Sequence, residues 1–285
     1  MDLSVVLVSY KTRDHLIKCL DALQADAGGF RSEIVVLDND SRDDIAGVVG
    51  ERYPTVRLRA NRENLGYARA VNQGISDTAG EFVLVLNPDC IVRPGALGTL
   101  IGYLREHPRT AVAGPRILNL DGSLEYSARS YPDHLTFLFN RYSLLTRLFP
   151  RNRFSRRYML TDWDHASVRE VDWMSGACLM VRRAAIREVG LMDEAFFMFN
   201  EDVDWCRRMH QGGWAVTYVP DAVVVHHIGA SRGGASAKVI YGRHLGMIHY
   251  FHKHHPSNPL LALLVDGVIL LRAGLMIAVN AIRPR

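Results

Sequence analysis

Three carboxylates stand close together in the stretch 200–204, which is Asn-Glu-Asp-Val-Asp. The stretch follows the aromatic and apolar run 196–199, so we expect an apolar wall beside Glu201 and Asp202. Such a wall desolvates a neighbouring carboxylate and raises its pKa, and the carboxylate can then act as a general base toward a substrate hydroxyl. The structural alternative is that these acids stabilise the N-terminus of a helix through its dipole.

Asn87 and Asp89 follow the fully apolar run 82–86. A carboxylate at the end of a buried strand suits a hard divalent cation, which can hold a diphosphate at the same time. One carboxylate makes a sparse site, but Mg²⁺ is often bound through only one or two protein carboxylates. The structural alternative is an ordinary turn after the strand.

Two adjacent histidines, His226 and His227, end another apolar run and precede a glycine-rich segment that contains Arg232. An imidazole nitrogen can bind a divalent cation, and a guanidinium group can bind a phosphate. We therefore expect one histidine to face the metal and Arg232 to meet a phosphate. The spacing leaves open which histidine it is, and a structural role is the alternative for each.

Polar or small residues also end the apolar runs 4–9 and 33–38 and precede the expected helix 67–75. Such side chains can hydrogen-bond a base or a ribose, and the N-terminus of a helix attracts phosphate. The alternatives are an Asx turn after the second run and a capped helix that packs tightly on a sheet. The candidates of this group are Ser9, Tyr10, Asp38, Asn39, Asn64 and Gly66.

Several function classes are excluded. The first apolar run is followed by neither G-x-G-x-x-G nor a Walker A sequence, which argues against a nicotinamide-dependent dehydrogenase and a P-loop NTPase. The four cysteines have no zinc-ribbon spacing and fit a reducing cytosol. The first ten residues lack the basic region of a signal peptide. A net charge of +4 is too small to indicate a nucleic-acid partner.

Strand and helix patterns alternate over the first 115 residues, and this rhythm positions the candidate residues. It predicts an α/β fold with a doubly wound, mostly parallel sheet, flanking helices and ligands at the carboxyl ends of the strands. The expected strands are 4–9, 33–38, 56–59, 82–86 and 111–114, and the expected helices are 14–23, 45–53, 67–75 and 95–106.

The pattern changes after residue 114. Asp121 and Gly122 predict a hairpin turn. Beyond the turn we expect strands at 171–182 (interrupted at 175–176), 215–219 and 222–225, and helices at 202–211, 239–254 and 260–282.

In their order along the chain, these segments resemble the family 2 glycosyltransferases of GT-A fold, most closely the rhamnosyltransferase-like branch. The resemblance covers roughly residues 3–255; each motif is weak by itself, but the ordered set is specific. The matching segments are VVLVSY near the start, DNDS at 38–41, ENLGYARAVNQG at 63–74, LNPDC at 86–90, WMSGACLMVRR at 173–183, VGLMDEAFFMFNEDVDWCRRMHQGGW at 189–214 and VVHHIGAS at 224–231.

The resemblance implies an inverting transfer from a nucleotide-diphosphate sugar. Asp38 would contact the uracil or thymine base, and Tyr10 would line the same pocket. The resemblance and the strand-end pattern together place the nucleotide against Ser9, Tyr10, Asp38, Asn39, Asn64, Gly66 and Asn87, with Arg232 at the phosphates.

The acceptor and metal residues also follow from the resemblance. Asp202 matches the base that deprotonates the acceptor hydroxyl for in-line attack, and Glu201 would position the acceptor. Asp89 matches the last acid of the family's DxD metal motif and His226 its late metal-facing histidine, so the implied cofactor is Mg²⁺ or Mn²⁺. Here Asn87 replaces the first acid, a form that recurs in the rhamnosyltransferase-like branch. The residues expected to border the sugar and the acceptor are Trp173, Ser175 and Gly176.

Two segments favour contact with a membrane. Residues 137–160 interleave six arginines with large apolar residues, which suits an anionic surface or a lipid diphosphate; a solvated loop is the alternative. Residues 260–282 form a nearly apolar helix that Asp266 and Arg272 interrupt on one arc. We expect it to lie at a membrane surface, with a homodimer interface as the competitor.

The sequence therefore predicts a catalytic domain at 1–235, with a nucleotide-binding half up to about 115 and an acceptor half after it, and a helical appendage at 236–285. The expected reaction moves a sugar, in the first place L-rhamnose from dTDP-L-rhamnose, to a cell-envelope acceptor that can be lipid-diphosphate-linked. A UDP-hexose or UDP-galactofuranose donor is the alternative, and a nucleotide-sugar-binding protein or scaffold subunit without turnover is a rival of another class. We expect a cytoplasmic protein that is peripheral to the inner face of the membrane.

Overall fold

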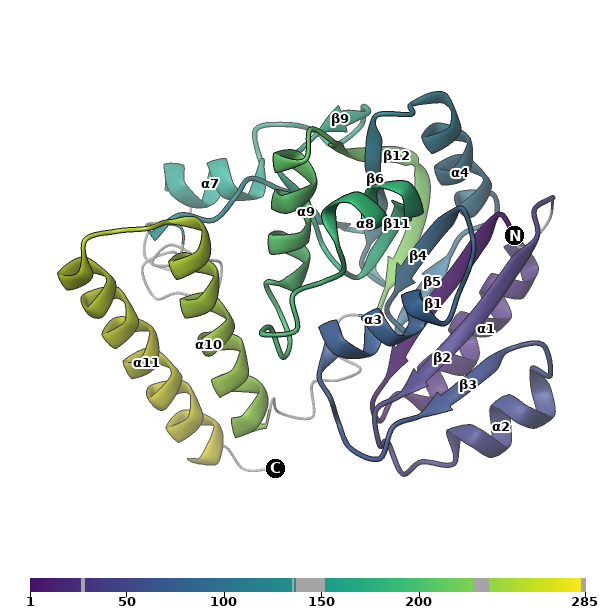
Figure 1. Cartoon of the computed structure of the whole chain (residues 1–285), viewed down its shortest axis with the longest axis horizontal. Helices are drawn as coiled ribbons and strands as arrows, with labels where there is room; N and C mark the ends of the chain where they lie inside the picture. Colours follow the sequence, from purple (N-terminus) through teal and green to yellow (C-terminus); the bar gives the residue numbers. More distant parts are fainter. Residues whose placement is uncertain (27–28, 135, 137–151, 228–235, 283–285) are drawn as a thin grey trace.

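The structure is a computed structural model that describes residues 1–285 except 27–28, 135, 137–151, 228–235 and 283–285 (Figure 1). Most of the arginine-rich segment expected at 137–160 therefore lies outside the described residues. Arg232, expected at the phosphates, also lies outside them.

A single large sheet forms the centre of the molecule, in the order β3-β2-β1-β4-β11-β6-β12-β5 (Figure 1). Its first four strands in this order run parallel. Every residue of β1 and β4 is buried, as is typical of parallel strands covered on both faces. The strands are β1 Leu3–Ser9, β2 Ser32–Asp38, β3 Arg57–Ala60, β4 Phe82–Leu86, β5 Cys90–Val92, β6 Thr110–Leu118, β7 Leu124–Glu125, β8 Ala128–Arg129, β9 Arg169–Glu170, β10 Trp173–Met174, β11 Cys178–Arg182 and β12 Ala215–His226.

Helices cover both faces of the sheet. Alternate residues of β1 face opposite sides, so Leu7 packs in the core under α1, α2 and α4, and Val6 packs in the core under α3, α8 and α9. This arrangement confirms the predicted α/β fold with a mostly parallel sheet. The helices are α1 Arg13–Asp26, α2 Ile45–Arg52, α3 Tyr67–Ser76, α4 Ala96–Glu106, α7 Arg153–Met159, α8 Arg183–Val189, α9 Glu201–Gln211, α10 Ala237–His254 and α11 Pro259–Ile282.

The second half of the sheet departs from the sequence prediction in two ways. The strands of the first 115 residues were expected to form a parallel sheet, but β11 enters antiparallel between two of them, β4 and β6. The segments predicted as two strands, 215–219 and 222–225, form the single strand β12, with a register shift between Val219 and Val223. Pro220 and Asp221 are typical turn residues, but here they occupy a bulge that lets the strand continue.

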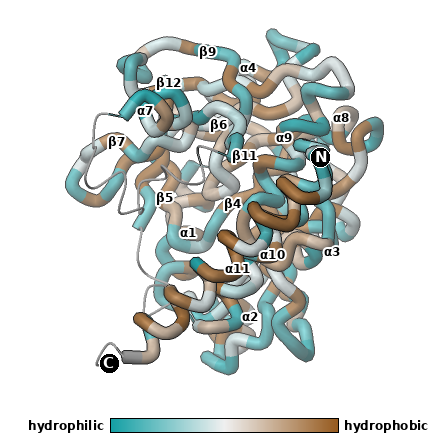
Figure 2. The backbone as a smooth tube through the Cα atoms, turned by 90° about the vertical axis from the view of Figure 1, so that its left-hand side faces the viewer, coloured by the Kyte–Doolittle hydropathy of each residue, from teal (hydrophilic) through white to brown (hydrophobic). Residues whose placement is uncertain are grey.

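Helices α10 and α11 form an antiparallel pair at one end of the molecule, beyond α9 (Figure 1). The inward side of α11 carries buried Ile269 and Ala273 together with Asp266, which pairs with His252 of α10 at 2.9 Å. The outward arc is apolar: Leu263 is 71% exposed and Leu271 66%. Figure 2, which looks onto this end of the molecule, shows α11 as a largely hydrophobic stretch of the backbone tube. By length and composition alone, α11 meets the criteria for a helix that can cross a membrane.

Candidate active site

The ends of β1 and β2 lie side by side, with Ser9 opposite Asp38. The Ser9 side chain is buried and shares a hydrogen bond with the Thr12 hydroxyl at 2.9 Å. Tyr10, in contrast, is 43% exposed, so its ring can border a ligand at this edge. The Asp38 carboxylate accepts a hydrogen bond from the Ser41 amide at 3.1 Å, so the Asx turn that was the structural alternative does form.

Side-chain amides link the loop before α3 to the end of β2. The buried Asn39 amide donates to the Gly66 carbonyl at 3.1 Å, and its oxygen accepts from Asn61 at 2.9 Å. Asn64 in turn accepts a hydrogen bond from the Gly66 amide at 3.0 Å. Only 2% of Asn39 is exposed, so this geometry favours a role in holding the loop over the direct nucleotide contact we expected from the sequence.

Gly66 joins this loop to the segment before α9. Its φ of +87° and ψ of 172° fall in a region that is essentially restricted to glycine. An added Cβ would lie 2.5 Å from the Phe197 carbonyl oxygen, which also accepts the Tyr67 amide at 2.7 Å. The Tyr67 hydroxyl donates to the Gly176 carbonyl at 3.1 Å. Because Gly66 has no side chain, the loop before α3 packs directly against the segment before α9.

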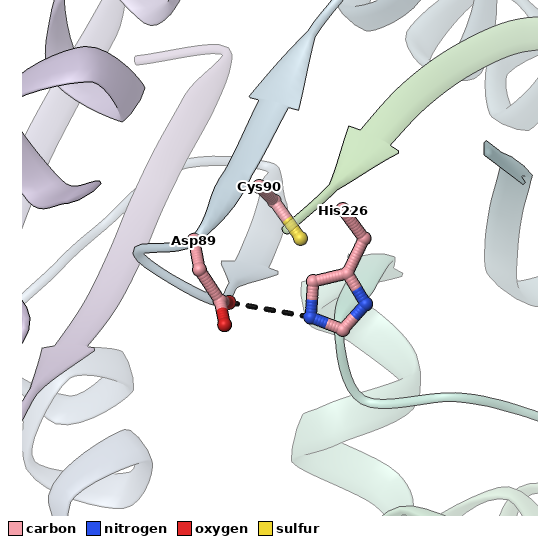
Figure 3. A group of neighbouring side chains, drawn as sticks. All are labelled: Asp89, Cys90 and His226. Atoms are coloured by element: carbon pink, nitrogen blue, oxygen red, sulfur yellow. Dashed lines mark ion pairs between the residues drawn. The ribbon is translucent and has the colours of Figure 1, made fainter. Parts of the chain in front are cut away.

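Asp89, Cys90 and His226 form the one group of potential metal ligands found among the described residues (Figure 3). The His226 Nε2 atom lies 3.3 Å from an Asp89 carboxylate oxygen. Two ligands on adjacent corners of an octahedral Mg²⁺ site would be about 3.0 Å apart, so these two atoms fit a shared divalent cation. Cys90 does not fit the same role, because burial raises its thiol pKa well above the usual value and its Sγ donates to the Ala177 carbonyl.

The two adjacent histidines have different surroundings. His226 points toward Asp89 (Figure 3). The His227 ring instead contacts the His15 ring edge-on at 5.5 Å, while its backbone amide donates to the Asp89 carbonyl. Only His226 therefore presents a ring nitrogen to the carboxylate, in line with the residue that the resemblance singled out.

Glu125 is a partner of His226 that the sequence analysis missed. Its carboxylate lies 2.8 Å from the His226 Nδ1 atom, on the opposite side of the ring from Asp89. Burial by itself lowers the pKa of His226, but the hydrogen bonds to Asp89 and Glu125 outweigh it and raise the pKa to about 9. The predicted hairpin at Asp121 and Gly122 was a signal for this region, but nothing local singled out the glutamate.

Glu201 and Asp202 are adjacent acids at the start of α9. Glu201 is buried and one of its carboxylate oxygens has no hydrogen-bond partner, whereas Asp202 accepts from the Gly176 amide at 2.8 Å and the Val203 amide at 2.9 Å. Burial raises the pKa of both groups, and the Asp202 charge raises that of Glu201 further. Two carboxylates this close to each other disfavour carrying two charges at once, so they take up and release protons as a pair.

Trp173 and Ser175 come shortly before Gly176, whose amide contacts Asp202. Trp173 is buried, donates its indole N–H to the Ser130 carbonyl at 2.8 Å, and stacks under the Arg129 guanidinium at 5.0 Å. The positive charge of Arg129 opposes the rise in the Asp202 pKa. Arg129 comes from the two-residue strand β8, and the sequence analysis did not identify it.

Asp204, the third acid of the cluster, has a structural position. It is fully buried and contacts Arg208 at 2.8 Å, Lys253 at 2.8 Å and His254 at 2.7 Å. These contacts join the helix that carries Glu201 and Asp202 to α10.

Known proteins were compared with this chain by sequence. Residues 2–240 match the model of the glycosyltransferase-like family 2. The chain is 34% identical over 296 residues to the N-acetylglucosaminyl-diphospho-decaprenol L-rhamnosyltransferase of Mycobacterium tuberculosis, covering 99% of this chain and 95% of that protein. It is 26% identical over 230 residues to the rhamnosyltransferase WbbL of Escherichia coli, covering 78% and 82%.

Solved structures show a similar fold. A mannosyltransferase from Pyrobaculum calidifontis in complex with GDP-Man and Mn²⁺ superposes with a TM-score of 0.60, covering 98% of this chain and 72% of that protein. The two sequences are 16% identical, so this likeness concerns the fold.

Proposed function

Because this chain belongs to the glycosyltransferase-like family 2 and is a glycosyltransferase, we propose that it transfers L-rhamnose from dTDP-L-rhamnose to a lipid-diphosphate-linked sugar acceptor. The support for the sugar and the acceptor is the rhamnosyltransferase from M. tuberculosis, which is similar over almost the whole chain. A UDP-sugar donor with the same chemistry is the alternative.

Asp202 is the proposed catalytic base. As the acceptor hydroxyl attacks the anomeric carbon, Asp202 takes the hydroxyl proton, a new carbon–oxygen bond forms, and the bond from the anomeric carbon to the diphosphate oxygen breaks. The attack proceeds in line and inverts the anomeric configuration. Glu201 is proposed to position the acceptor beside this base, and burial together with the Asp202 charge raises the pKa of Glu201.

Asp89 and His226 are the residues that would hold a divalent cation, Mg²⁺ or Mn²⁺. A bound cation would stabilise the negative charge that develops on the departing diphosphate. The Mn²⁺ in the similarly folded mannosyltransferase supports this proposal.

The donor nucleotide is proposed to lie at the carboxyl ends of β1, β2 and β4. Exposed Tyr10 and half-buried Asp38 would contact the base, while Asn64 and Gly66 shape the adjoining loop. Asn87 follows β4 on the same edge of the sheet.

The acceptor is proposed to approach from the side of Trp173 and Gly176, where Arg129 supplies a positive charge. The apolar outward arc of α11 supports a location at the inner face of the cytoplasmic membrane, where a lipid-linked acceptor resides. In this proposal residues 1–235 form the catalytic domain, and 236–285 form an appendage that contacts the membrane; a homodimer contact is the alternative for the same surface.

The observation that carries the proposal is the position of Asp202, an ionisable base on α9 beside Gly176 and Trp173, in a chain of this family. The test is a panel of nucleotide sugars with Mg²⁺ or Mn²⁺, scored by thermal shift and then by transfer to a polyprenyl-diphosphate-linked N-acetylglucosamine. We expect dTDP-L-rhamnose to give the largest shift and the product. If only a UDP-sugar supports transfer, the assignment of dTDP-L-rhamnose as the donor is wrong. If nucleotide sugars bind but no sugar is transferred, the result favours a nucleotide-sugar-binding or scaffold protein without turnover.

A further inference from the structure

The imidazole of His226 is held between two carboxylates that lie on opposite sides of the ring. Its Nε2 atom faces Asp89 at 3.3 Å, and its Nδ1 atom faces Glu125 at 2.8 Å. All three side chains are nearly buried, with exposed side-chain fractions of 7% for Glu125, 11% for Asp89 and 12% for His226. A buried ring with a partner on each nitrogen has little freedom to rotate.

The fold brings Glu125 to this place through a short hairpin. Asp121 accepts hydrogen bonds from the Ser123 amide and hydroxyl and fixes the turn. β7 then pairs with β6, so that Glu125 stands opposite Ile117. The other edge of β6 pairs with β12, which ends in His226. The hairpin therefore has a defined register that places the carboxylate against the ring.

We propose that Glu125 is a positioning residue for the metal ligand His226: by accepting the Nδ1 hydrogen it aims the Nε2 lone pair at the cation shared with Asp89. The inference rests on the proposed function only in taking Asp89 and His226 as the cation ligands. Histidine ligands commonly donate their second ring N–H to a carboxylate, which fixes the tautomer and the ring orientation.

A purely structural ion pair is the competing explanation. If the ion pair is purely structural, its loss should lower the stability of the hairpin. The affinity for a cation should then fall only in proportion to the loss of folded protein. The two explanations therefore separate when cation affinity and cation-free stability are measured on the same variants.

The test uses the full-length protein with Mn²⁺ as the probe. Glu125→Met keeps the length of the side chain but removes the acceptor, whereas Glu125→Gln keeps an acceptor oxygen. Glu170→Gln is the matched control, because Glu170 also faces a histidine, His210 at 3.9 Å, but on the exposed strand β9. Calorimetry gives the Mn²⁺ dissociation constant, and pulsed electron paramagnetic resonance reports the coupling of an imidazole nitrogen to the bound ion.

We expect Glu125→Met to weaken Mn²⁺ binding by about 10–100-fold and to lose the imidazole coupling. Glu125→Gln should keep the coupling and bind more tightly than the Met variant, and the control should match the wild type. Mn²⁺ affinity of the Met variant within about twofold of wild type, with the coupling intact, would overturn the proposal.

Folding is checked by the cation-free melting temperature and by binding of dTDP. If Glu125→Met does not fold, Glu125→Ala takes its place with the same expected result. Failure of the wild type to bind Mn²⁺ through an imidazole would also overturn the proposal. A different donor sugar would refute the proposed function alone, because none of these readouts requires transfer.

Discussion

Asp202→Asn tests the assignment of the base most directly. Removing a positioned general base costs about 10²–10⁴ in rate, or about 2.7–5.4 kcal/mol of transition-state stabilisation. The substitution also disturbs two local contacts, because Asp202 accepts from both the Gly176 and Val203 amides. An asparagine has only one acceptor oxygen, so one of these N–H groups faces an NH₂ group.

The local cost sets the expected stability change. An N–H left without its acceptor costs about 1–3 kcal/mol. Each kcal/mol shifts the melting temperature of a chain of this size by about 2–4 °C. We therefore expect a variant that melts slightly lower, still binds the donor, and transfers sugar at least about 100-fold more slowly. Asp221→Asn, an exposed acid in the bulge of β12, is the matched control and should behave as the wild type.

The pH profile gives a second readout. Burial raises the pKa of Asp202, and the base works only when it is ionised. The wild-type rate should therefore fall as the pH drops through this raised pKa, at a higher pH than for an ordinary aspartate. Asp202→Asn should lack that acid limb. A variant with more than about a tenth of the wild-type rate and an unchanged acid limb would refute the reasoning.

Three other predictions concern the metal, the loop and the membrane. Asp89→Asn should weaken Mn²⁺ binding and make transfer sensitive to low concentrations of a chelator; a rate unaffected by EDTA would contradict this. Gly66→Ala should lower the melting temperature by about 5–10 °C, because the glycine-only backbone angles alone are worth about 1–3 kcal/mol and the new Cβ meets the Phe197 carbonyl; an unchanged melting curve would contradict this. Replacing exposed Leu264 and Leu271 with Glu should move the protein from the membrane to the soluble fraction, which sedimentation measures; persistent membrane binding would place the anchor elsewhere.

The sequence predicted the parallel part of the sheet well, because its signals are local. β1, β2 and β4 each contain a short apolar run, and the polar residues that follow must meet at one edge of the sheet. The antiparallel entry of β11 was not predictable in this way. Its pairing with β4 and β6 depends on contacts far apart in the chain, and its apolar pattern is the same in either direction.

The candidate site shows the same difference between residues with a local sequence signal and residues placed by long-range contacts. Asp89, Asp202 and His226 stand at the ends of strands or the start of a helix, so their patterns are visible in the sequence. Glu125 and Arg129 belong to strands of two residues, whose position depends on β6 and β10. The sequence also could not show that the Asn39 side chain hydrogen-bonds to Asn61 and Gly66, which lie 22 and 27 positions further along the chain.

The proposed membrane contact of α11 would also affect α9, the helix that carries the proposed base. On the inward side of α11, Ile269 is buried with residues of α10 and Asp266 pairs with His252, while exposed leucines line the outward side. A membrane surface, as proposed, would accept the outward leucines and would favour a paired Asp266, because unpaired polar groups are costly in an apolar surrounding. The same α10 holds Asp204 through Lys253. In the proposed function, a helix pair bound to a bilayer would therefore also hold the helix that carries Asp202, at the surface where a lipid-linked acceptor would arrive.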